Sequence, residues 1–402
     1  MLAALSPGDA RRGRQPLPTI MRFTKSTKGK NMSHRSWPPL SGFGAALIGA
    51  FSGWLMPGQA GASDFPSLQD LYTGSYRLPP SESPKPVTGK KIWFVSCSQD
   101  VSLCAAEAAG TQEAGRLLGW DTTIFDGKYD PAVMANGIRQ AIAGKFDAVV
   151  LAGADCNGVK GPLAEARDSG LKIVSIEGVD CSVSDPGEPS LFDAAVTYVE
   201  GDLIPWVKKY GAWQADYVIA KTGGKAEAIV LVSDEVLVSK LTSEATIEEL
   251  KRCPGCTVHE VSFSYGSQGP QLQQLAEQAL LRFPNANSLI VPADSVILSG
   301  VGPAIEASGR DLVVVAAEGQ EATMNLVRAG SRQVSAGVGI PSAWEGYAAV
   351  DALNRVFNGQ PAVNSGAGLQ VFDKDHNAGT AGAFNASTDF VAAYKKAWGI
   401  TE

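Results

Sequence analysis

Two glutamates, Glu177 and Glu318, occupy matching places in two stretches of the chain that share one pattern. In each stretch an apolar segment ends in Ala-Asp, a helix-forming segment ends in Ser-Gly, and a second apolar segment ends in Glu-Gly. Carboxylates at strand ends over a cleft accept paired hydrogen bonds from hydroxyl or amine groups. We therefore expect Glu177 and Glu318 to bind a small ligand. The alternative is a solvent-facing acid or a partner of a helix N-cap.

Other candidate ligand-binding residues also follow predicted strands or open helices. They are Ser98, Gln99, Asp100, Asp155, Tyr265, Asp294 and Trp344. The first three lie in one loop and could contact a ligand with side chains and helix N-terminal amides. Both aromatic rings could stack on a sugar or aromatic ligand, with core packing as the alternative. For Asp155 and Asp294, helix N-capping is the stronger interpretation.

The elements that must position these residues alternate between strand and helix from Lys91 onward. Apolar strand segments separated by helical segments are typical of doubly wound parallel sheets. Because one βαβ pattern occurs twice, we expect an α/β fold with two related lobes. Ligands of such sheets bind beyond the carboxyl ends of the strands, so both lobes should face one cleft. The loop 180–193 could form a lid there, or be a surface excursion.

The first 62 residues differ from the rest of the chain. A basic segment (22–35) precedes the apolar run Gly42–Met56 and the small residues 60–62. This order is typical of a cleavable signal peptide, and the run is shorter than the roughly 20 residues of a membrane-spanning helix. We expect cleavage after Ala62 and a periplasmic protein, with a retained membrane helix as the alternative. Met32 would give a leader of ordinary length, so the true start is open; residues 63–89 should form an irregular arm.

Charge and residue types argue against several classes of function. Without residues 1–62 the chain has 26 basic and 40 acidic residues, a formal charge of −14, which disfavours nucleic acid as a partner. The two remaining histidines, His259 and His376, do not suggest a triad or a metal site. No dinucleotide fingerprint follows the first strand, so no cofactor is expected. A secreted hydrolase using Glu177 and Glu318 remains the alternative from a different class.

All six cysteines follow residue 62, and an even number in an exported chain indicates disulfides. Position favours three pairs: Cys97 with Cys104, Cys156 with Cys181, and Cys253 with Cys256. The last pair could instead bind zinc or do redox chemistry, but it closes a helix rather than opening one. We interpret it as a structural clip.

From Lys91 to Gly359 the order of elements resembles the type 1 periplasmic solute-binding proteins, the ribose-binding-like branch of ABC import systems. The resemblance rests on Lys91–Ser96, Phe146–Asp155, Ile173–Gly178, Val313–Gly319 and the Gly-Ile-Pro segment ending at Pro341. It implies two lobes joined by a multi-strand hinge. The first would be residues 90–199 plus 340–362, and the second 200–339 plus 363–402.

The resemblance implies a monomeric receptor that captures a small molecule between its lobes and delivers it to an ABC permease in the membrane. The sugar-binding pattern is altered here: Glu177-Gly178 stands where the family has Asp-Arg, Ala293 precedes Asp294 where the family has Asn, and Gly339 replaces a hinge Gln. A polyol, a sugar-like molecule, an amine or a small aromatic ligand therefore remains open. A sensor for a membrane signalling protein is the alternative within the class.

Overall fold

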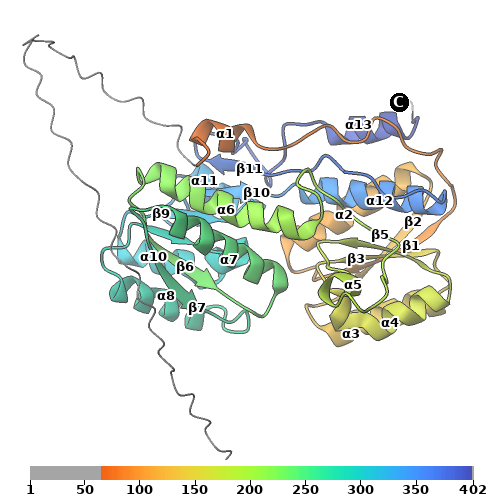
Figure 1. Cartoon of the computed structure of the whole chain (residues 1–402), viewed down its shortest axis with the longest axis horizontal. Coiled ribbons are helices and arrows are strands. Elements are labelled where there is room, and N and C mark those ends of the chain that lie inside the picture. Colours follow the sequence, from red (N-terminus) through yellow and green to blue (C-terminus); the bar gives the residue numbers. More distant parts are fainter. Residues whose placement is uncertain (1–64, 401–402) are drawn as a thin grey trace, which may run out of the picture. The chain divides into compact units, whose positions relative to one another are not determined.

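The computed structural model describes residues 65–400 (Figure 1). The predicted signal peptide, residues 1–62, lies outside the described residues. Among the helices of the described part, none is long and apolar enough to cross a membrane.

The first lobe contains a parallel sheet in the order β2-β1-β3-β4-β5. Its strands are β1 (Lys91–Ser96), β2 (Asp121–Asp126), β3 (Ala148–Ala152), β4 (Lys172–Ile176) and β5 (Ala194–Ala195). Its helices are α2 (Ser102–Leu117), α3 (Pro131–Ala143), α4 (Cys156–Asp168), α5 (Cys181–Ser184) and α12 (Ser342–Phe357). Helices α2 and α12 pack together on one face, while α3 and α4 pack together on the other (Figure 1).

The second lobe contains a sheet in the order β11-β10-β9-β8-β6-β7, parallel except for the β10–β11 pair. Its strands are β6 (Glu227–Val232), β7 (Thr257–Ser262), β8 (Ser288–Ile290), β9 (Val313–Ala316), β10 (Ala336–Gly339) and β11 (Gln370–Asp373). The main helices are α6 (Leu203–Lys221), α7 (Leu237–Arg252), α8 (Pro270–Arg282), α10 (Gly302–Ser308) and α11 (Glu321–Arg328). A short turn α9 (Asp294–Val296) and a π-helix η1 (Ile297–Val301) lead into α10.

The two sheets repeat one topology. The order β2-β1-β3-β4 in the first lobe matches β7-β6-β8-β9 in the second. Central strands such as β3 are buried along their whole length, because helices cover both faces of a parallel sheet. This confirms the predicted α/β fold with two related parallel-sheet lobes.

Local signals set several helix starts. The Asp130 carboxylate accepts hydrogen bonds from the backbone of Ala132 and Val133, and Pro131 opens α3; both features favour a helix start at this point. The segment predicted as an irregular arm, residues 63–89, contains one short helix, α1 (Leu68–Thr73), which begins with a capping box between Ser67 and Asp70.

Three segments of the chain cross between the lobes: those after β5, after β10 and after α12. They are joined by backbone hydrogen bonds, from Val199 to the carbonyl of Ala367 (2.9 Å) and from Ser365 to that of Thr197 (3.1 Å). The N-terminal arm runs beside them, and Arg77 donates to the carbonyl of Gly366 (2.9 Å). The last helix, α13 (Phe390–Ala397), packs on α12. The residue boundaries of the lobes remain a prediction.

Candidate functional site

A cavity of about 610 Å³ lies where strands of both sheets end. Its walls come from the loops after β1, β2, β3 and β4 in the first lobe, and after β6, β7, β8 and β9 in the second. Its size is in the range of small-molecule sites, and its position is the crevice at which open α/β sheets bind ligands.

Glu177 and Glu318 line the cavity from opposite lobes. Both have left-handed backbone, with φ of 50° and 40°, a conformation that costs energy for residues other than glycine. Strained backbone of this kind collects at binding and catalytic sites, where the surrounding structure enforces it. The repeated Glu-Gly pattern therefore marks two equivalent turns that hold carboxyl groups at the cavity.

Asp155 and Asp294 support these turns. The Asp155 carboxylate accepts a hydrogen bond from the backbone of Val179 (3.1 Å), and Asp294 accepts one from the equivalent Gln320 (2.6 Å). Neither side chain caps the helix that follows it. The capping interpretation was wrong, because each aspartate bonds across to the end of the neighbouring strand. Asp155 lines the cavity, whereas Asp294 does not.

Two tyrosines form a second equivalent pair. Tyr129 lies three residues after β2, and Tyr265 lies three residues after β7, the matching strand of the other lobe. Both line the cavity. The Tyr265 hydroxyl is 2.6 Å from the Ser239 hydroxyl, which fixes the ring, while Tyr129 is 53% exposed. Tyr265 was predicted from the sequence but Tyr129 was not, although the match between β2 and β7 places it at the equivalent position.

The remaining candidates divide between the cavity and the core. Ser98 and Asp100 line the cavity, but Gln99 does not: its amide donates to the Ser96 hydroxyl (2.7 Å). Trp344 is a core residue rather than a cavity residue, because it is fully buried and its indole N–H donates to the carbonyl of Ser365 (3.1 Å). The loop 180–193 contributes no residue to the cavity wall.

The cavity is acidic. Its lining includes five carboxyl groups and no lysine, arginine or histidine; the acids are Asp100, Asp155, Glu177, Glu235 and Glu318. Burial raises the pKa of Glu318 well above its usual range, and the charges of Asp294 and Glu177 raise it further. Burial and the charge of Glu345 likewise raise the pKa of Glu177. A neutral or positively charged ligand suits these walls, and an anion does not.

A family model described as a periplasmic binding protein domain matches residues 92–361. The chain belongs to this family. The family is one of substrate-binding proteins rather than enzymes. The match confirms the resemblance to periplasmic solute-binding proteins that the sequence showed. No curated protein matches the chain.

Solved structures of periplasmic binding proteins share the fold. The ABC sugar transporter subunit from Rhodobacter sphaeroides 2.4.1 is 18% identical, with a TM-score of 0.60 over 72% of this chain and 99% of that chain. The periplasmic solute-binding protein from Actinobacillus succinogenes 130z, with bound D-allose, is 16% identical (TM-score 0.62; 71% and 98%). The 5-methylthioribose transporter protein from Thermotoga lettingae TMO, in complex with 5-methylthioribose, is 20% identical (TM-score 0.58; 74% and 89%).

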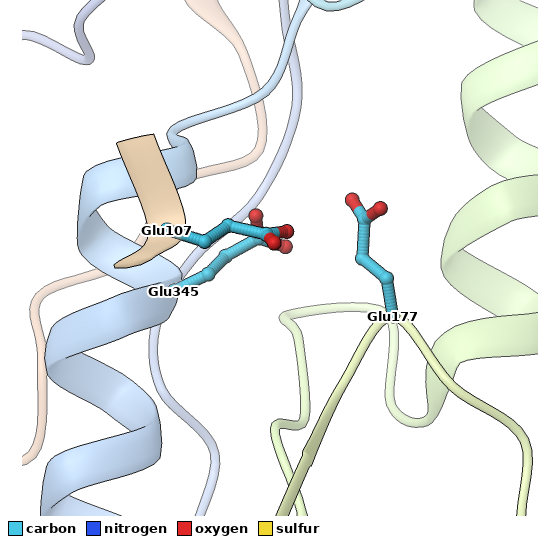
Figure 2. Close-up of side chains that lie close together, drawn as sticks. All are labelled: Glu107, Glu177 and Glu345. Atoms are coloured by element: carbon cyan, nitrogen blue, oxygen red, sulfur yellow. The ribbon is translucent and has the colours of Figure 1, made fainter. Parts of the chain in front are cut away.

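Behind the cavity of this periplasmic binding protein lie two further glutamates that the sequence analysis missed. Glu107 on α2 and Glu345 on α12 are fully buried and face Glu177 (Figure 2). The two helices can approach closely because Gly110 has no side chain. A Cβ at this position would lie 2.4 Å from the carbonyl oxygen of Ala343, too close for any other residue. Gly346 is equally constrained, since its Cβ would lie 2.4 Å from the backbone nitrogen of Thr111.

Burial dominates the electrostatics of this group. It raises the pKa of Glu345 to about 8, and the nearby hydroxyl of Tyr198 counteracts part of the rise. Burial also raises the pKa of Glu107 well above its usual range, as do the charges of Glu177, Glu345 and Glu318. An ionised carboxylate is costly in such a setting unless a proton or a cation neutralises it.

Three disulfides confirm the predicted pairing: Cys97–Cys104, Cys156–Cys181 and Cys253–Cys256. The first two lie at the cavity edge of the first lobe. Cys97 lines the cavity, and Cys156–Cys181 joins the residues that follow β3 and β4. The Cys156–Cys181 bond cross-links the segments that carry Asp155 and Glu177, which limits the ways those segments can move apart, whereas Cys97–Cys104 closes the loop between β1 and α2.

Proposed function

We propose that the protein is an exported receptor that captures a small, uncharged or cationic polar molecule between its lobes and delivers it to an ABC permease. A sugar-like molecule or a polyol is the leading ligand class. The observation that carries the proposal is the cavity itself, walled by equivalent turns from two lobes. Structural relatives support it, because the printed ligands of two of them are D-allose and 5-methylthioribose.

The cavity walls fit such a ligand chemically. Tyr129 and Tyr265 supply aromatic faces from opposite lobes, on which a sugar ring or the carbon side of a polyol can stack. Glu177 and Glu318 supply acceptors for hydroxyl or ammonium donors. Closure of the lobes would exclude water and strengthen these hydrogen bonds, so that ligand binding would shift the balance toward the closed form.

The test is thermal unfolding of the purified protein against sugars, polyols, amines and aromatic alcohols, followed by recovery of the compound. A specific ligand at a hundredfold its Kd should stabilise the protein by about 2.7 kcal/mol, a rise of several degrees in Tm. Stabilisation by one chemical class, with the compound recovered unchanged, supports the receptor. A hit that is consumed supports a hydrolase instead, and stabilisation by anions alone contradicts the proposed cavity chemistry.

A matched pair of variants ties the ligand to the cavity. Glu318→Gln replaces one carboxyl oxygen by an amide NH2 and should weaken ligand binding by about tenfold, because a ligand donor left without its buried acceptor costs roughly 1–3 kcal/mol. Glu248→Gln removes an exposed acid on α7 and should leave affinity unchanged. Equal affinity of both variants, measured by calorimetry, would place the ligand elsewhere.

A further inference from the structure

Glu107, Glu177 and Glu345 form a three-carboxylate cluster at the back of the cavity wall. One oxygen from each lies within 4.8 Å of the other two. Oxygens bind calcium at about 2.3–2.6 Å, so two oxygens on opposite sides of one ion are about 4.8 Å apart. Figure 2 shows the side chains of Glu107 and Glu345 converging from one side and that of Glu177 from the other. Three oxygens no farther apart than this can all contact a single ion.

Within the described residues, no lysine, arginine or histidine pairs with this cluster. Both carboxylate oxygens of Glu107 and of Glu345 are buried without a hydrogen-bond partner, as is one oxygen of Glu177. Of the ion pairs in the described part of the chain, none includes these three residues. A cluster of buried acids with no cation beside it is a poor arrangement for stability alone.

A fourth group points to the same spot. Tyr198 is fully buried, and its hydroxyl interacts with the Glu345 carboxyl group, whose pKa it lowers. The hydroxyl lies beside Glu345 and is within electrostatic reach of Glu177 and Glu107. This one hydroxyl leaves both oxygens of Glu107 and one oxygen of Glu177 buried without a donor, and a bound cation would satisfy them.

The backbone holds the cluster in place. Gly110 and Gly346 let α2 and α12 approach until Glu107 and Glu345 meet, and the left-handed turn at Glu177 directs the third carboxyl group toward them. Three separate elements therefore present oxygen ligands to one point. A preorganised set of this kind is what a metal site requires.

We infer that Glu107, Glu177 and Glu345 bind one divalent cation of calcium size, with Tyr198 as a neighbouring oxygen. All the ligands are oxygens, which select hard cations over zinc or copper. Carboxylates that can bind through one or both oxygens suit the flexible six- to eight-fold coordination of calcium better than the strict octahedron of magnesium. The ion would join α2 and α12 to the turn after β4. It would thereby hold Glu177 at the cavity wall, whatever ligand the cleft takes.

The test is calcium titration of the chelator-treated protein by isothermal calorimetry at pH 8, where protons compete less for the carboxylates. We expect one calcium ion per chain and a rise in Tm that EDTA reverses. Glu107→Gln and Glu345→Gln should each weaken calcium binding by at least about tenfold. The exposed Glu248→Gln is the control and should bind as the wild type does. The inference is overturned if the protein binds no calcium up to millimolar concentration, or if both cluster variants bind calcium as tightly as the wild type.

Terbium luminescence tests the position of the ion without requiring a change in a buried acid. Terbium replaces calcium at oxygen sites and is excited by neighbouring aromatic rings; here these are Tyr198 and Trp206, whose ring centres are 4.2 Å apart. Emission that calcium displaces, and that Tyr198→Phe or Trp206→Phe reduces, supports the site. Emission unaffected by either substitution places the ion elsewhere and overturns the inference. Because no cleft ligand is present in either experiment, their outcome does not depend on the proposed transport function.

Discussion

Asp216 should make the protein less stable as the pH rises toward 8, and Asp216→Asn should remove that effect. The side chain lies on α6, is 3% exposed, and has one oxygen without a hydrogen-bond partner. Burial, the charge of Glu249 and a hydrogen bond with it raise the pKa of Asp216 from 3.8 to about 8, although Arg252 offsets part of the rise. The folded protein therefore keeps a proton that the unfolded chain has lost.

The sign and size follow from proton linkage. Between pH 4 and pH 8 the folded state binds more protons than the unfolded state, so the free energy of unfolding falls as the pH rises. From pH 5 to pH 8 this one group contributes a loss on the order of 3–4 kcal/mol. An asparagine amide has the shape of the neutral acid and does not titrate. The stability of Asp216→Asn relative to the wild type should therefore increase by that amount between pH 5 and pH 8.

Guanidinium unfolding of the wild type and of Asp216→Asn at pH 5, 6.5 and 8 measures the difference between their free energies of unfolding directly. Glu248→Gln is the control, because it removes an exposed acid from α7, next to the partner residue Glu249. Its difference from the wild type should hardly change with pH. If Asp216→Asn also shows the same difference at pH 5 and pH 8, then Asp216 is ionised in the folded protein and the reasoning fails.

Three further changes test the packing. Gly346→Ala forces a Cβ against the α2 backbone and should cost about 1–3 kcal/mol by chemical unfolding; an unchanged stability would show that α2 and α12 can separate freely. Trp344→Ala should cost about 3–5 kcal/mol, since the ring is fully buried, and a variant that instead loses only ligand affinity would restore Trp344 to the site. Replacing Cys156 and Cys181 together by alanine should lower the free energy of unfolding by about 3 kcal/mol, which a lower Tm under oxidising conditions would reveal. An unchanged Tm would mean that the cross-link does not constrain the unfolded chain.

The lobes were predictable because their signals are local. A strand such as β3 is apolar along its whole length, and a helix such as α3 begins with a cap and a proline. In contrast, β11 carries little local signal: it is four residues long and pairs antiparallel with β10 across more than thirty residues. Its place in the sheet depends on long-range pairing that a single sequence does not display.

The site was predictable where the chain repeats itself and obscure where it depends on packing. Glu177 and Glu318 stand out because the same pattern occurs twice. Glu107 and Glu345 do not, because an acid on a helix is ordinarily a solvated surface residue, and only the close approach of α2 to α12 buries these two. Trp344 was predicted to bind ligand but lies in the core, because an aromatic residue beside a hinge fits a core position as well as a binding position.

The N-terminal arm has a consequence for how the lobes move. It is fastened to the second lobe where the Tyr72 hydroxyl donates to Asp373 (2.6 Å), and to the first where the Ser83 hydroxyl donates to Asp351 (2.6 Å). Between these points the backbone N–H of Arg77 donates to the carbonyl of Gly366, so the arm forms a fourth connection beside the three crossing segments. Any rotation of one lobe against the other must therefore carry the arm with it or break one of these bonds, so residues distant from every ligand contact tie the two lobes together.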